Sequence, residues 1–517
     1  MKTATLILLL LCLGFAAQTF LQPGHTWGGD FSLYIRQAQG LASQQTQRVT
    51  DDTRFMIENS SDHTFSPAAY PWGFPLILWP WVKRADTTEP FFAPTLSDLN
   101  TFKQVEIFCF LGFVLLFALW ARDAFRGWVP LMLTAFVALQ QNYLSYLNHI
   151  LAEMPYLLFL MASMLAIARL MRLWNRAGST CCAASESGSE SDSSAPSWPN
   201  YKMALLTAFC TGTLLLFTAQ IRTEGFLLFG ALAAAQAAKV WRCCKEGKKP
   251  TFAQWLFLGI PYVGAALSMG VWSAVLPSGF LSHIDHGTLI SAATLKRNAL
   301  ALFDGFGSYL PLPGFGRWII ALFLLVALVG WVKNLLRDTA PAAMLALTLG
   351  LFLVWPHYEW RYLFSIFPFV AFFFVRGLEA IPLPLPETIL PAVVIMLLLN
   401  TGLTVTRNLS NPPQLLNGPC RTESQEMFSF IREKTAPDNV VAFFRPRVMC
   451  LYTQRKSLTL FGSFTDIVQK AQWYVVTLDQ GTFYQHNEAN LARYRRYLKE
   501  TFRNQNFIVY QVIPNPQ

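Results

Sequence analysis

The sequence has 517 residues, of which 53% are hydrophobic and only 14% are charged, with a formal net charge of +10. A soluble protein would carry roughly 25% charged residues, so the composition excludes an ordinary soluble protein. No module of basic and aromatic residues typical of nucleic-acid binding is visible, and we expect no nucleic-acid partner. Several apolar runs reach the ~20 residues that a helix needs to span a bilayer, and the alternating pattern of a membrane barrel is absent. The sequence therefore predicts a polytopic α-helical membrane protein.

The apolar runs predict about eleven transmembrane helices. The first, in MKTATLILLLLCLGFAAQTFLQ, also has features of a signal peptide, but its length favours an uncleaved span. The stretch YPWGFPLILWPWV at 70–82 is apolar but short and contains three prolines, which favours a juxtamembrane or re-entrant segment. The predicted spans are residues 4–21, 104–121, 128–147, 150–171, 202–220, 224–240, 253–276, 317–336, 340–356, 362–376 and 388–406.

Basic residues in short loops predict the orientation of these spans. They follow every second span, which places the N-terminus and these loops on the cytoplasmic side. The outer segments are then residues 22–103, 277–316 and the tail after 406. The inner segment 177–200 is of low complexity, and we expect a flexible linker there. This organisation predicts a transmembrane domain over 1–406 and an extracytoplasmic domain over 407–517, in a protein of the cytoplasmic membrane.

The tail has the pattern of a small α/β domain. SQEMFSFIREKT at 424–435 predicts a helix, and VVAFFRP, SLTLF, WYVVTL and FIVYQVI predict short strands. NLARYRRYLKETFRNQ at 490–505 predicts a helix between the last two strands. Cys420 and Cys450 share this domain, and their pairing in a disulfide is left open.

The sequence places its unusual ionisable residues at the outer ends of the predicted spans, where each such residue needs an explanation. Asp30 and Tyr34, in GGDFSLYIRQ, follow the first span. Asp30 is placed either to cap the helix that follows or to act as a general base at the membrane surface. His149 and Glu153, in NHILAEMPYLLF, are four residues apart and are expected on one helical face.

Two further clusters contain arginine. Arg222 and Glu224, in AQIRTEGFLLF, lie at a tight outer turn, where they form either an ion pair, a helix cap or part of a site. Tyr358 and Arg361, in WPHYEWRYLFSIF, precede an apolar helix. Arg361 can extend toward the lipid headgroups, but its guanidinium also suits bidentate binding of a phosphate.

Motifs for a cofactor are weak or absent. HIDH at 283–286 has metal-ligand residue types without a spacing that fixes a geometry, and the sequence shows no glycine-rich nucleotide loop, HExxH or GxSxG. We therefore expect no cofactor, and a divalent metal has little support.

In order along the chain, GGDFSLYIRQAQGLA, YPWGFPLILWPW, NHILAEMPYLLF, IRTEGFLLF and YEWRYLFSIFPFV resemble the motifs of GT-C glycosyltransferases. The sequence is most similar to the bacterial branch of protein O-mannosyltransferases and lipid A aminoarabinose transferases, of the glycosyltransferase family 39 type. The likeness covers about residues 1–406, and the tail resembles the outer domain of bacterial members.

The resemblance implies an inverting transferase that takes a sugar from a polyprenyl-phosphate donor to an extracytoplasmic lipid, glycan or protein. It implies Asp30 as the base, Glu153 as a second acidic residue and Arg361 at the donor phosphate. From the clusters at the outer ends of the spans we also expect further residues to bind the donor phosphate or the substrate, namely Arg222, Tyr358, Glu224, His149 and Tyr34. The chain departs from the family where Phe31 follows Asp30, because many members have a second acid there, and this disfavours a metal bridged by two acids. The alternatives are a flippase for lipid-linked saccharides and a non-catalytic scaffold.

Overall fold

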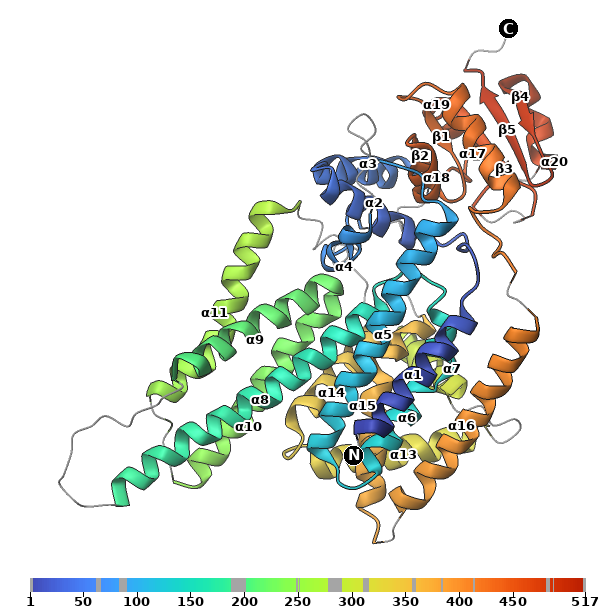
Figure 1. Ribbon diagram of the computed structural model, residues 1–517. Coiled ribbons are helices and arrows are strands. Elements are labelled where there is room, and N and C mark those ends of the chain that lie inside the picture. The colour runs from blue at the N-terminus through green and yellow to red at the C-terminus, as the bar shows by residue number, and fades with distance from the viewer. Residues whose placement is uncertain are drawn as a thin grey trace.

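The structure is a computed structural model that describes residues 3–61, 67–82, 91–186, 201–247, 250, 252–277, 291–309, 316–355, 359–382, 385–411, 414–479, 484–486 and 488–514. It consists of a long bundle of helices with a small domain of helices and strands at one end (Figure 1). The N-terminus lies at the opposite end of the bundle from that domain.

The protein is a polytopic membrane protein, as the composition predicts. Among the described residues, eight helices are long and apolar enough to cross a membrane. They are α1 (Thr3–Phe20), α5 (Leu96–Ala124), α8 (Glu153–Glu186), α9 (Tyr201–Ile221), α11 (Phe252–Val275), α13 (Gly316–Asn334), α15 (Leu363–Glu379, preceded by the 3-10 turn η5, Trp360–Tyr362) and α16 (Leu385–Ser410).

The other predicted spans also fall on helices, but these are shorter or broken. The predicted span 128–147 is two helices, α6 (Val129–Ala138) and α7 (Gln141–Tyr146), while α14 (Thr339–Val354) has 16 residues. Residues 224–240 fall on the turn η3 (Thr223–Phe226) and α10 (Leu227–Lys245). The total of eleven crossings therefore stays a prediction. Helix α8 continues to Glu186, so the expected linker over 177–200 is wrong in its first ten residues.

Helix α15 lies at the centre of the bundle. Within its apolar window 83% of the residues are buried inside the protein, against 22% for α1, α13 and α16. Its partner α13 approaches closely because both helices have glycine at the crossing: a Cβ on Gly330 would lie 2.0 Å from the carbonyl oxygen of Phe373. Small residues at such crossings are how membrane helices pack without a hydrophobic driving force.

A layer of short helices covers one end of the bundle. It contains α2 (Asp30–Ala42), α3 (Thr46–Asn59) and α4 (Gly73–Leu78), which continues into the turn η2 (Trp79–Trp81). The six residues of α4 are too few to cross a membrane. The predicted outer segment 277–316 contains the helix α12 (Ala292–Phe306) and the 3-10 turn η4 (Gly307–Tyr309).

The tail forms a five-stranded sheet in the order β2-β1-β3-β5-β4, with β1 parallel to β2 and β3 and the other pairs antiparallel. The strands are β1 (Val440–Ala442), β2 (Lys456–Leu458), β3 (Trp473–Thr477), β4 (Leu498–Arg503) and β5 (Phe507–Val512). The helices are α17 (Thr422–Lys434), α18 (Pro446–Thr453), α19 (Phe464–Lys470), α20 (Glu488–Leu491) and η6 (Ala492–Tyr497).

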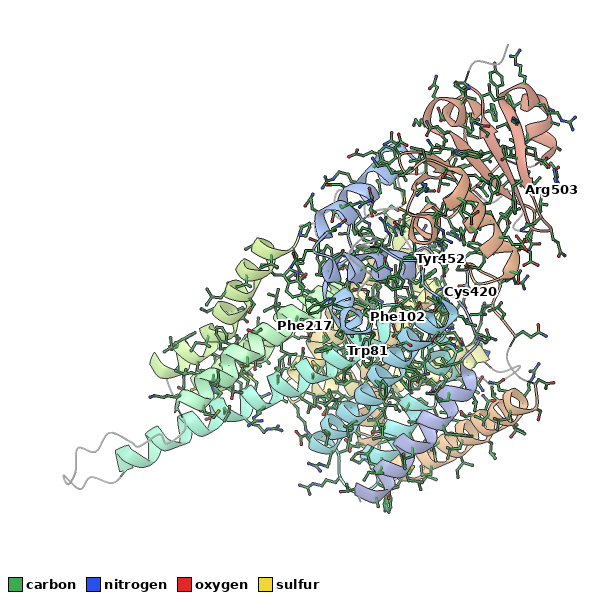
Figure 2. The ribbon with its side chains drawn as sticks, turned by 45° about the horizontal axis from the view of Figure 1, so that its top comes forward. Trp81, Phe102, Phe217, Cys420, Tyr452 and Arg503 are labelled. Carbon is green, nitrogen blue, oxygen red and sulfur yellow. The ribbon has the colours of Figure 1, made fainter. Side chains whose placement is uncertain are left out.

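One expectation for the tail is wrong, and the question of the two tail cysteines is answered. Residues 498–503, expected in a helix, form β4, because the edge of β5 offers hydrogen-bond partners that outweigh local helix propensity. Cys420 and Cys450 are both free. The Cys450 sulfur accepts a hydrogen bond from Arg36 Nη1 at 2.7 Å, whereas Cys420 Sγ lies 3.9 Å from the hydroxyl of Tyr452 (Figure 2).

The tail packs on the layer of short helices. Trp27, just before α2, inserts its ring among four tail phenylalanines, with the closest ring centroid, that of Phe444, at 5.3 Å. The backbone N–H of Ser61 donates to Thr459 O at 2.8 Å. The first predicted outer segment and the tail therefore lie at the same end of the bundle.

Candidate active site

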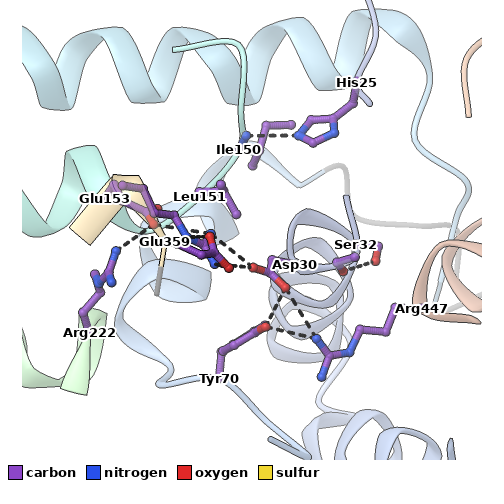
Figure 3. A network of polar contacts seen from close by, with 12 residues as sticks. His25, Asp30, Ser32, Tyr70, Ile150, Leu151, Glu153, Arg222, Glu359 and Arg447 are labelled. Atoms are coloured by element: carbon purple, nitrogen blue, oxygen red, sulfur yellow. Dashed lines mark hydrogen bonds and ion pairs between the residues drawn. The ribbon is translucent and has the colours of Figure 1, made fainter. Parts of the chain in front are cut away.

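Asp30 is the first residue of α2, but it does not cap that helix. The preceding residue, Gly29, occupies the cap position without a side-chain bond, and the N-terminus is braced by Ser32, whose hydroxyl donates to Gly29 O at 2.6 Å. The Asp30 carboxylate instead accepts a hydrogen bond from Tyr70 at 2.7 Å and pairs with Arg361 at 3.3 Å (Figure 3). Capping, the structural alternative for Asp30, is thus excluded.

Cations hold Asp30 in its charged form. Burial alone would raise the pKa of this carboxyl, but the guanidinium groups of Arg361 and Arg447 outweigh burial and hold the pKa below its ordinary value. Arg447 Nη1 lies 3.7 Å from the carboxylate and donates to the Tyr70 hydroxyl at 3.0 Å. The Asp30 side chain keeps 31% of its surface exposed, so an ionised carboxylate is open to an incoming group.

Glu153 begins α8, where a negative charge is favoured by the helix dipole. Its carboxylate is buried and pairs with Arg222 Nη1 at 2.7 Å and with Arg361 Nη1 at 3.5 Å. A buried carboxylate requires such partners. Arg361 therefore joins the two acids that the sequence predicts as catalytic, Asp30 and Glu153.

His149 and Glu153 do not share a helical face, contrary to the sequence expectation. Residues 147–152 are not helical, because side chains take the place of helical backbone partners: Ile150 N donates to His25 Nε2 and Leu151 N donates to Glu106 Oε1. The His149 ring packs on Tyr146 and His25, with ring centroids 4.9 and 5.7 Å away. Burial holds the pKa of His149 below its ordinary value, which disfavours the charged imidazole.

His25 supports this loop as a neutral side chain. Burial lowers its pKa to about 3. Its ring stacks on Phe31 at 3.8 Å, Nδ1 donates to Thr26 O at 2.9 Å, and Nε2 accepts from Ile150. His25 thus connects the start of α2 to the loop before Glu153, which fixes the two acids relative to each other.

Arg222 lies at the extended residue between α9 and η3. It makes a two-pronged pair with Glu224, at 2.6 and 3.2 Å, in addition to its bond to Glu153. Of the three alternatives raised from the sequence, the ion pair between Arg222 and Glu224 is observed, and Arg222 also connects this pair to Glu153. The cation also lies over the rings of Tyr156 and Tyr362.

The remaining predicted residues are Tyr34 and Tyr358. Tyr34 is buried and stacks on Tyr70, with ring centroids 4.6 Å apart. It therefore packs against the tyrosine that donates to Asp30 and does not contact Asp30 through a hydrogen bond of its own among the described contacts. Tyr358 lies outside the described residues, as does HIDH at 283–286. Glu359, next to Tyr358, pairs with Arg361 Nε at 2.5 Å and is 48% exposed.

Tyr70 and Arg447 are the important members that sequence reasoning misses. Tyr70 precedes Pro71 in a stretch whose sequence indicates only an apolar segment. Arg447 lies 417 positions after Asp30, in the tail helix α18. Neither stands out in composition. A third omission is Glu106, a buried acid within the apolar part of α5, which an ionisable-residue scan of the spans would find.

Among the residues that the structure describes, no group of three or more His, Cys, Asp or Glu side chains is arranged to hold a metal ion. Between Asp30 and Glu153 the structure has the guanidinium of Arg361. The absence of a cofactor stays a prediction.

No protein-family model and no curated protein matches the chain. Solved structures do. Over 99% of this chain and 99% of its own, ArnT from Cupriavidus metallidurans superposes with a TM-score of 0.51 at 11% identity. The Archaeoglobus fulgidus oligosaccharyltransferase with a tethered acceptor peptide superposes with a TM-score of 0.54 at 10% identity, over 99% of this chain and 74% of its own. The chain has the GT-C fold.

The GT-C fold confirms the fold class that the five motifs predict. A second ArnT structure, which contains undecaprenyl phosphate, matches with a TM-score of 0.50, and AglB from A. fulgidus with dolichol-phosphate and an inhibitory peptide matches with 0.52, both at 11% identity. The match to ArnT covers the tail as well as the bundle, since it spans almost all of both chains.

Proposed function

We propose that the protein is an inverting glycosyltransferase. It moves a sugar from a polyprenyl-phosphate-linked donor to an acceptor on the extracytoplasmic face of a bacterial cytoplasmic membrane. The observation that carries the proposal is the state of Asp30: a carboxylate that does not cap its helix, is kept ionised by two arginines and is partly exposed. Residues with perturbed pKa in such surroundings are typical of catalytic sites.

Asp30 acts on the acceptor. Its carboxylate takes the proton from an acceptor hydroxyl or amine as that group attacks the anomeric carbon of the donor sugar. The bond between that carbon and the phosphate oxygen breaks, and polyprenyl phosphate leaves with the bonding electrons. Tyr70 and Arg447 orient Asp30 through the hydrogen bond at 2.7 Å and the ion pair at 3.7 Å.

Arg361 and Arg222 act on the donor. A lipid-linked donor presents its phosphate at the headgroup plane, and the leaving phosphate needs charge stabilisation more than a proton. Two arginines at the starts of α15 and η3 suit such an anion. The undecaprenyl phosphate in ArnT and the dolichol-phosphate in AglB support this class of donor.

The charges of the network support a route for donor binding. Four carboxylates (Asp30, Glu153, Glu224, Glu359) surround three guanidiniums (Arg222, Arg361, Arg447). A phosphate must therefore displace one carboxylate from an arginine. Glu359 is the most exposed of the four carboxylates, and burial together with the charges of Asp30 and Glu153 raises its pKa. When the donor binds, its phosphate therefore takes the place of Glu359 on Arg361.

A flippase is the alternative function, and it needs polar groups along a path through the membrane. The charged network contains Asp30 of α2 and Arg447 of α18, and both helices lie at the end of the bundle opposite the N-terminus (Figure 1), which favours a transferase.

Asp30→Asn tests the proposal, because it keeps the shape of the side chain and removes the base. We expect transfer to fall by roughly 10²–10⁴-fold, the usual contribution of a general base, while binding of a polyprenyl-phosphate-linked sugar persists. The matched control is Asp52→Asn, which removes the acid that pairs with Arg36 elsewhere in the same segment. Undiminished transfer with Asp30→Asn, or loss of lipid translocation without loss of transfer, would overturn the proposal.

A further inference from the structure

A cavity of about 340 Å³ lies between α5, α8, α10, α14 and α15, away from the Asp30 network. Arg172 lines it, 19 residues after Glu153 on the same helix α8. At 1.5 Å per residue the two lie roughly 28 Å apart, which is about the thickness of the hydrocarbon core of a membrane. In Figure 1 helix α5 likewise runs from beneath α2 and α3 to the other end of the bundle. The cavity therefore lies near the opposite end of the bundle from the Asp30 network.

The wall of this cavity contains more basic than acidic side chains. The basic ones are Arg172, Lys239, Arg242, Arg337 and Arg376, and the acidic ones are Asp123 and Asp338. Each acid already pairs with one arginine: Asp123 with Arg172 at 2.5 Å and Asp338 with Arg376 at 2.9 Å. Within the described part of the chain no acid pairs with Arg242 or Arg337. The excess of positive charge in the wall thus favours the binding of an anion in this cavity.

One of these cations is built into the wall. The Arg376 side chain is only 2% exposed, and Asp338 and Glu379 hold it from two directions, at 2.9 and 2.8 Å. Its guanidinium lies over the rings of Phe125 and Phe372, at 4.4 and 5.3 Å. Such a guanidinium is fixed in place before any ligand arrives, so binding an anion orders little more of the protein.

The rest of the wall is apolar. Trp120, Met164, Ile167, Met171 and Phe372 line the cavity together with the basic residues. A free phosphate would use only the charged part of such a wall. A phosphate carried on glycerol and acyl chains would use both parts, and basic pockets between membrane helices are typical binding sites for lipid headgroups.

We propose that this cavity binds the headgroup phosphate of an anionic phospholipid from the leaflet opposite the Asp30 network. Arg242 and Arg337 take the phosphate charge beside Arg376, and the lipid chains lie against the apolar wall. The site is separate from the proposed transfer reaction and would hold the inner ends of five helices together.

Native mass spectrometry of the full chain, released from vesicles of equal phosphatidylglycerol and phosphatidylethanolamine, tests this proposal. We expect Arg242→Ala/Arg337→Ala to reduce retained phosphatidylglycerol at least tenfold relative to the parent. The matched control, Lys245→Ala/Lys333→Ala, removes the same charge from α10 and α13 at residues that do not line the cavity, and we expect a change of less than twofold. Equal losses in the two double variants, or no preference for phosphatidylglycerol in the parent, would overturn the proposal.

A second arm separates lipid from free anion and from misfolding. Arg242→Lys/Arg337→Lys keeps both charges, and we expect it to retain phosphatidylglycerol within threefold of the parent. Inorganic phosphate at millimolar concentration should displace little of the bound lipid, because it makes no use of the apolar wall. Complete displacement by inorganic phosphate would overturn the lipid assignment in favour of a soluble phosphate, and loss of lipid in the lysine variant would overturn the role of the two charges.

Discussion

Asp30 is held by two arginines that are far from it in sequence. Arg361 precedes α15, and Arg447 belongs to α18 in the tail. Both favour the charged carboxylate and so oppose the effect of burial. The charge state of the proposed base thus depends on the tail as well as on the bundle.

Arg447→Gln removes one of these two cations, so the pKa of Asp30 rises. A base with a raised pKa becomes protonated at higher pH, and the acid limb of kcat/KM should move to higher pH. At neutral pH we expect activity within about tenfold of the parent, because Arg361 still favours the ionised form. The pH profile of kcat/KM is the measurement.

Arg503→Gln provides the control for this change. Arg503 is also in the tail, but it is exposed and pairs with Glu488 and Glu500. The acid limb of kcat/KM in Arg503→Gln should coincide with that of the parent. An unmoved acid limb in Arg447→Gln would show that the tail does not set the state of Asp30.

Some residues of the site could be predicted from the sequence and others could not. Asp30, Glu153, Arg222 and Arg361 could be predicted, because ionisable side chains at the ends of apolar runs are costly and therefore conspicuous. The structure brings these four into one network. Tyr70 could not be predicted, since a tyrosine in an aromatic stretch is common at a membrane surface.

At the scale of elements, the site depends on a close contact between α4 and the end of α9. Gly73, three residues after Tyr70, packs on the backbone of Gln220 and Ile221, and Arg222 follows directly. A Cβ on Gly73 would lie 2.6 Å from the carbonyl oxygen of Gln220. This contact sets the distance between the segment that holds Tyr70 and the turn that holds Arg222.

Gly73→Ala should therefore separate the two segments. We expect a loss of stability of about 1–3 kcal/mol from overpacking and a loss of transfer of at least about tenfold, because small displacements in a catalytic site cost activity steeply. Thermal unfolding and transfer assays on the purified protein measure both effects.

Gly259→Ala is the matched control, since no atom lies within 4 Å of the Cβ that it would add. It should leave both quantities unchanged or slightly raise stability, because alanine favours helix over glycine. If Gly73→Ala behaved like Gly259→Ala, the contact would not position the site.

The elements themselves were predictable where their apolar pattern is long. Most of each predicted span is helical, although 128–147 is divided between α6 and α7, because the bilayer requires internally bonded backbone. The non-helical loop at 147–152 and strand β4 were not predictable, since each depends on partners distant in the sequence: Glu106 and His25 for the loop, and β5 for the strand.

For the whole molecule, the main question is how the tail is attached to the bundle. Trp27 fills a pocket of tail rings, with the centroids of Phe444, Phe443, Phe507 and Phe428 between 5.3 and 6.3 Å away. Trp27 is three residues before Asp30. The same short segment therefore anchors the tail and presents the proposed base.

Trp27→Ala should loosen the tail, because removing a buried tryptophan costs about 3–5 kcal/mol. We expect faster hydrogen exchange in α18 and a fall in transfer, as Arg447 leaves Asp30 and Tyr70. Trp318→Ala is the control, since Trp318 is 82% exposed, and it should change neither. Unchanged exchange in α18 of Trp27→Ala would mean that other contacts hold the tail.

The central claim is that Arg361 and Arg222 receive the donor phosphate beside the base Asp30. A cryo-electron microscopy structure of the protein with a polyprenyl phosphate bound in a lipid disc tests this most directly. The account predicts phosphate oxygens at hydrogen-bond distance, about 3 Å, from the guanidinium of Arg361 or Arg222, with Glu359 displaced from Arg361. A lipid phosphate bound away from both arginines, with Arg361 still paired to Asp30, Glu153 and Glu359, would contradict it.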